Sequence, residues 1–127
     1  MNLADAYSLT GQDARARETI ERALEISRNA GYRALEARAL YFSGKIIARG
    51  PESAAAQQAY QAAFAIALKL GMRPLAADCH FGMGQSHQRV GRLAEARAEF
   101  SRATGLYRKM GMQFYLKKAE VELQAIH

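Results

Sequence analysis

Residues 77–103 read ADCHFGMGQSHQRVGRLAEARAEFSRA, and the rest of the chain contains further copies of this stretch. Bulky and small residues alternate at spacings of three and four on both sides of Gly91. Apolar residues at such spacings predict amphipathic helices, and a glycine between two of them predicts a helix end. The stretch therefore predicts two antiparallel helices joined by a turn at Gly91.

The same pattern returns at intervals of forty residues toward the N-terminus. The matching positions are His80, Met83, Gly84, His87, Ala96, Phe100 and Ala103 in one copy, Leu40, Ser43, Gly44, Ile47, Ala56, Tyr60 and Ala63 in the preceding one, and Leu3, Ala4, Tyr7, Ala16, Ile20 and Ala23 in the first. Gly31, Gly71 and Gly111 recur in the same register and predict the end of each hairpin. A fixed period of this kind indicates stacked helical hairpins.

The alternation of bulky and small residues resembles the tetratricopeptide repeat, although the period here is longer than the usual one of about 34 residues. The resemblance implies an all-α, right-handed α-solenoid that forms a single domain over residues 1–127. We expect about seven helices, the first of them short and ending before Gly11. The expected divisions are a truncated first repeat at 1–30, a second repeat at 31–70, a third at 71–110 and a C-terminal capping helix at 111–127.

Four short segments carry a second resemblance: LGMRPLA at 70–76, CHFGMG at 79–84, YRKMGM at 107–112 and FY at 114–115. With the long period, they resemble the C-terminal repeat region of large bacterial regulators that also carry a cyclase or DNA-binding module and a signalling ATPase. This resemblance implies a sensing or docking role in a signalling regulator and brings no catalytic residue. The first repeat lacks its early positions, so either the protein begins there or Met1 lies within a longer protein, and we favour the second interpretation.

Composition narrows the classes of partner. The chain has 18 Lys and Arg against 12 Asp and Glu, a net charge of +6 at pH 7, which attracts polyanions without specificity. Acidic residues are interleaved with the basic ones and no nucleic-acid motif is present, so we do not expect a nucleic-acid partner. No apolar run is long enough to cross a bilayer, and one cysteine fits a reducing compartment. We expect a cytoplasmic protein without a membrane partner.

In the repeat family that the chain resembles, the first helix of each hairpin lines the concave surface. The register places there Asp5 from the first copy and the following candidates for partner binding: Arg38, Tyr41, Lys45, Arg49, Asp78, Phe81, Gln85, Gln88 and Arg89. Aromatic anchors with arginines suit an acidic, partly apolar peptide segment. The predicted function is non-catalytic docking of a protein or peptide in this groove, and the plainer alternative is a solvated face with two half-buried rings.

Other interpretations remain open at this stage. A small molecule bound between stacked hairpins would make the chain a sensing domain, and a stripe of Ile20, Ala23 and Leu24 left uncovered by the truncated repeat would favour a homodimer. We expect no cofactor, metal or catalytic residue. Cys79 lies on the inner stripe, His80 and His87 are two helical turns apart, and the Gly82-x-Gly84 pair falls within a helix, where it serves packing and not a phosphate loop.

Overall fold

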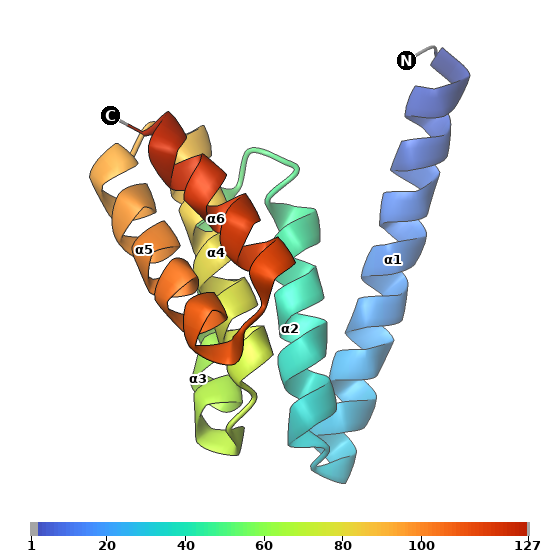
Figure 1. Ribbon diagram of the computed structural model, residues 1–127. Helices are drawn as coiled ribbons and strands as arrows, with labels where there is room; N and C mark the ends of the chain where they lie inside the picture. Colours follow the sequence, from blue (N-terminus) through green and yellow to red (C-terminus); the bar gives the residue numbers. More distant parts are fainter. Residues whose placement is uncertain (1–2, 127) are drawn as a thin grey trace.

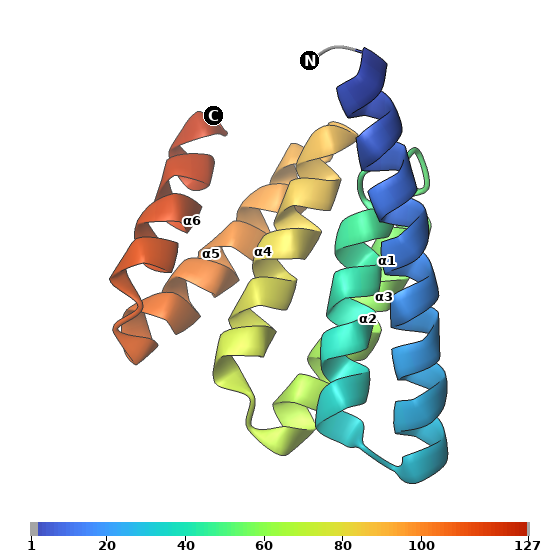
Figure 2. The same ribbon diagram turned by 90° about the vertical axis from the view of Figure 1, so that its right-hand side faces the viewer.

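The computed structural model describes residues 3–126, with side chains described from residue 13 onward. This part of the chain consists of six helices and contains no strand: α1 (Leu3–Ala30), α2 (Arg33–Ile47), α3 (Ser53–Leu70), α4 (Arg73–Arg89), α5 (Leu93–Met110) and α6 (Gln113–Ala125). Consecutive helices run antiparallel and pack side by side, and α2 also reaches α4 (Figures 1 and 2). The predicted all-α solenoid of stacked hairpins is confirmed.

The predicted helix end at Gly11 is wrong, because α1 continues through Gly11 to Ala30 and the helices number six in the described chain. A glycine inside a helix costs about 1 kcal/mol relative to alanine. A turn at Gly11 would instead leave a first helix of fewer than ten residues, and helices that short are marginal without a packing partner. The beginning of α1 extends past the end of α2 and has no helix beside it (Figure 1).

The predicted helix ends at the later glycines are confirmed. Gly71 follows α3 with a φ of +70°, and Gly111 follows α5 with a φ of +68°. In this left-handed conformation the next amide turns back toward the helix, so Met72 N–H donates to Ala67 C=O at 2.8 Å and Met112 N–H to Tyr107 C=O at 3.0 Å. These bonds are those of a Schellman motif, which favours glycine because a Cβ is strained there.

The core is organised by large rings that pack on small residues, as the repeat pattern predicts. Tyr60 of α3 is 2% exposed and lies against both Gly44 of α2 and Gly82 of α4. A Cβ added at Gly44 would approach the Tyr60 ring to 2.9 Å, and one at Gly82 would approach it to 2.6 Å. Tyr60 therefore joins its own hairpin to the next one. Phe100 of α5, fully buried, packs in the same way on Gly84 of α4.

The C-terminal helix completes the second half of the core. Leu116, Ala119 and Leu123 of α6 and Ile126 just after it are buried or partly buried against α4 and α5. None of the helices within residues 3–126 has the length and hydropathy that a membrane span requires.

The contact between Gly84 and Phe100 provides a stability test. Gly84→Ala would place a Cβ 2.8 Å from the fully buried ring, so we expect a loss of about 1 to 3 kcal/mol of unfolding free energy. The matched control is Gly105→Ala in α5, where an added Cβ meets no atom within 4 Å and helix propensity should raise stability by about 1 kcal/mol. Urea unfolding followed by circular dichroism measures both. Equal effects of the two substitutions would contradict the proposed packing.

Candidate functional site

Two adjoining hollows lie along the faces of α2, α4 and α6, and we call them together the groove. The first has a volume of about 370 Å³ and is lined by Tyr41, Phe42, Lys45, Asp78, Phe81, Gln85, Tyr107, Tyr115 and Lys118. The second has a volume of about 290 Å³ and is lined by Lys45, Ala48, Arg49, Tyr60, Gln85, Ser86, Gln88, Arg89 and Glu122. Because Lys45 and Gln85 belong to both, the two hollows form one continuous surface.

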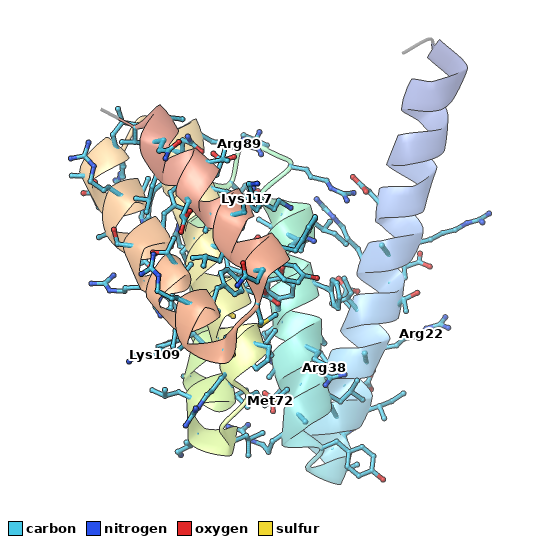
Figure 3. All side chains as sticks on the ribbon, in the orientation of Figure 1. Arg22, Arg38, Met72, Arg89, Lys109 and Lys117 are labelled. Atoms are coloured by element: carbon cyan, nitrogen blue, oxygen red, sulfur yellow. The ribbon has the colours of Figure 1, made fainter. Side chains whose placement is uncertain are left out.

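The groove brings together eight of the nine candidates that the structure describes, namely all except Arg38. Arg38 is exposed on α2 and lines neither hollow (Figure 3). The side chain of Asp5 lies outside the described residues. The structure therefore gathers eight of the predicted residues on one face.

A further set of groove residues comes from α6 and is missing from the sequence prediction. Tyr115, Lys118 and Glu122 are spaced by three and four residues, so they lie on one face of that helix. Lys118 also follows Asp78 by forty residues, as Asp78 follows Arg38. Extending the repeat register into residues 111–127 would have identified Lys118. The sequence prediction missed Lys118 because it assigned residues 111–127 only to a capping helix.

Aromatic rings form the apolar part of the groove. Tyr41 lies 5.9 Å from Tyr60 between ring centroids, and the Tyr107 ring stacks on Tyr115 at 5.6 Å. Tyr115 is 44% exposed, so part of its ring remains available to solvent. These contacts pack the rings of the groove against one another.

Lysine side chains lie over two of the aromatic rings that line the groove. Lys45 Nζ is 5.6 Å from the centroid of Tyr41, and Lys118 Nζ is 5.5 Å from the centroid of Phe81. An ammonium group at this distance is attracted by the ring quadrupole, which keeps the charge beside the apolar surface. The groove thus presents cations and aromatic rings together.

Asp78 is the acidic group within the first hollow. The Tyr107 hydroxyl donates a hydrogen bond to Asp78 Oδ1 at 2.5 Å. Burial raises the pKa of Asp78, while the Tyr107 hydrogen bond and the charges of Lys45 and Lys118 act in the opposite direction and only partly compensate. Burial and the hydrogen bond to Asp78 raise the pKa of Tyr107, so its hydroxyl stays protonated as the donor. An acid with a raised pKa in a hollow is typical of functional sites, though structural groups show it too.

Arginines and one serine line the second hollow. Arg49 forms an ion pair with Asp13 of α1 and so links the first two helices. Arg89 Nη2 donates to the Arg49 carbonyl at 3.5 Å. The hydroxyl of Ser86 is buried and has no hydrogen-bond partner among the described residues.

Cys79 and His80, the other residues considered for chemistry, are both buried on α4. Cys79 is fully buried, and burial raises the pKa of its thiol to about 12, so it acts as a small apolar residue. His80 Nδ1 lies 2.7 Å from Glu99 Oε2. Among the side chains of residues 13–126, no three His, Cys, Asp or Glu residues gather in an arrangement that would hold a metal.

The stripe expected to favour a homodimer is partly covered by α2. Ile20 and Leu24 line a small cavity of about 230 Å³ together with Ile46 and Ile47. The stripe is therefore neither fully buried nor widely open.

The raised pKa of Asp78 predicts how stability depends on pH. Because the folded-state pKa lies above the ordinary aspartate value of 3.8, the folded protein binds this proton more tightly, and stability falls as pH rises from the unfolded to the folded pKa. Asp78→Asn does not titrate, so its unfolding free energy relative to wild type should increase as the pH is raised from about 4 to about 7. Chemical denaturation across this range measures the difference.

Tyr107→Phe is the companion variant. It removes the hydrogen bond that lowers the pKa of Asp78, so its stability should fall more steeply with rising pH than that of wild type. Parallel pH profiles for wild type and Asp78→Asn would show that Asp78 is solvated like a surface acid.

The tetratricopeptide repeat model matches residues 1–29. No curated protein matches the chain. The matched segment is the first of the three copies, and the later copies carry the same pattern of small and bulky residues at the same forty-residue spacing. Repeats of this family generally mediate protein–protein interaction and are typically non-enzymatic. The match, the period and the stacked hairpins together support a relationship of this chain to the tetratricopeptide repeat proteins.

Proposed function

We propose that the chain is a non-catalytic interaction module that docks a protein or peptide segment in the groove. The observation that carries the proposal is the continuity of the groove across α2, α4 and α6, with aromatic rings and cations along its length. An extended segment can contact all three helices there, whereas each hollow alone is small for a globular surface. The match to a tetratricopeptide repeat supports an interaction role at this coarser level.

The charges of the groove favour an acidic partner. The cations that line it are Lys45, Arg49, Arg89 and Lys118, and the acids are Asp78 and Glu122. Carboxylates of a partner would pair with the arginines and lysines through charge-assisted hydrogen bonds, and its apolar side chains would pack on the exposed ring of Tyr115.

The wider setting of the proposal is a cytoplasmic signalling regulator of bacterial type. The resemblance of residues 60–127 to the repeat regions of such regulators supports this setting, and so does the free, buried thiol of Cys79. In that context the groove would receive a segment of another component of the same signalling system.

Two neighbouring lysines on α6 provide the test. Lys118 lines the groove, whereas Lys117 lies about 100° around the helix and does not line it (Figure 3). The probe is a fluorescent twelve-residue peptide that alternates glutamate with leucine and phenylalanine. We expect Lys118→Glu to weaken its binding at least tenfold, since it reverses a charge beside the aromatic anchors, and Lys117→Glu to change it less than twofold.

Fluorescence polarisation at two salt concentrations measures the affinities. A peptide of the same apolar residues with lysine in place of glutamate is the charge control and should bind at least tenfold more weakly. Equal effects of the two lysine substitutions would indicate non-specific attraction to a positive protein and would refute groove docking.

A further inference from the structure

A larger cavity lies on the face of α4 away from the groove, between α3 and α5, and we call it the crevice. Its volume is about 710 Å³. Its walls are Phe64 and Leu68 of α3 and Leu106 and Met110 of α5, and its floor includes Ala76 and His80 of α4. Apolar lining and this volume are typical of sites for small organic ligands, which occupy pockets of about 300 to 1,000 Å³.

The charges of the crevice all have one sign. Arg73, Arg102 and Lys109 line it, and no acidic residue does. Arg102 is held by Glu99, since its Nη1 donates to Glu99 Oε1 at 2.7 Å. Within residues 13–126, neither Arg73 nor Lys109 belongs to an ion pair, so these two charges have no protein partner.

The two unpaired charges lie at the same end of the crevice. Arg73 is the first residue of α4 and Lys109 is the last but one of α5, so in these two antiparallel helices both residues lie toward the same end, where the helices spread apart (Figure 2). Phe64 and Arg102 lie about two turns away from that end along α3 and α5. The crevice therefore has two unpaired cations at its mouth, apolar side chains along its walls, and farther in Arg102, whose charge is paired with Glu99.

Gly105 keeps the interior open. It lies in the middle of α5, where glycine costs about 1 kcal/mol relative to alanine, and a Cβ added to it would meet no atom within 4 Å. Packing therefore does not require glycine at this position, in contrast to Gly82 and Gly84. What the missing side chain provides is space, because Gly105 lines the crevice.

Phe64, His80 and Arg102, which line the inner part of the crevice, are held in place by a series of contacts that ends at Glu99. The Phe64 ring lies 4.5 Å from the His80 ring between centroids. Burial alone would raise the pKa of Glu99, but the His80 hydrogen bond and the charges of His80 and Arg102 outweigh it and lower that pKa. Glu99 is thus ionised and accepts from both neighbours, which fixes His80 and Arg102 in place. A preformed wall loses little entropy when a ligand binds.

We propose that the crevice binds a small amphipathic monocarboxylate, a molecule with an aliphatic chain and one anionic headgroup that is free in solution. The chain lies between Phe64 and Leu106 over the open space at Gly105, and the carboxylate pairs with Arg73 and Lys109. The polarity of the crevice selects this class, since a wholly apolar molecule leaves the mouth unpaired and a polyanion cannot enter the apolar interior. The site lies apart from the groove and does not depend on the function proposed for it.

The test uses decanoate as the probe, with decanol as its uncharged match. Isothermal titration calorimetry of the whole chain should show one site for decanoate and at least tenfold weaker binding of decanol. Gly105→Leu should abolish decanoate binding by filling the crevice, while its melting temperature without ligand stays at or above that of wild type. This variant separates loss of the site from loss of the fold.

A second pair of variants tests the cationic mouth. Lys109→Gln should weaken decanoate at least fivefold and leave decanol within twofold, whereas Lys117→Gln, on a helix that does not line the crevice, should change neither. Equal affinity for decanoate and decanol, or unchanged decanoate binding by Gly105→Leu, would overturn the proposal. Binding of the chain to phosphatidylglycerol vesicles without any binding of free decanoate would also overturn it in favour of a lipid surface.

Discussion

The ring of Tyr60 packs directly on the backbones of Gly44 and Gly82, and this close approach fixes the positions of three helices at once. A side chain at either glycine would meet the ring at less than 3 Å, so α2 or α4 would have to move outward. Both surfaces described above depend on that spacing, because α2 and α4 form the groove and α3 and α4 form one side of the crevice. Phe100 on Gly84 repeats the arrangement one hairpin later.

Helix α4 separates the two surfaces and contributes to each. Asp78 and Phe81 face the groove, and Ala76 and His80 face the crevice. Helical periodicity makes this possible, since residues two apart on a helix point about 200° away from each other. The groove contains acids among its cations and exposed aromatic rings, whereas the crevice contains only cations and a mostly aliphatic lining. Their chemistry therefore differs, and so do the ligands proposed for them.

Local patterns were predicted well from the sequence, and features that depend on distant segments were not. The left-handed glycines at 71 and 111 and the small residues beneath Tyr60 and Phe100 follow from spacing within one or two hairpins. The helix end at Gly11 was wrong because glycine permits both a turn and a helix, and packing decides between them. The position of Gly105 could not be explained from sequence, because the cavity it lines is closed by α3 of the preceding hairpin.

The groove residues show the same contrast between features that local spacing predicts and features that depend on distant segments. Eight of the candidates described by the structure gather as their register implies, while Arg38 faces solvent outside the hollows and α6 adds Tyr115 and Lys118.

Each helix packs mainly on its neighbours in the chain, with α1 held by α2 and α6 by α5. Such a chain behaves as a row of nearest-neighbour units, so its ends can open while the middle stays folded. Protection of backbone amides from hydrogen exchange should accordingly rise from α1 and α6 toward the centre at α3 and α4, which border both the groove and the crevice.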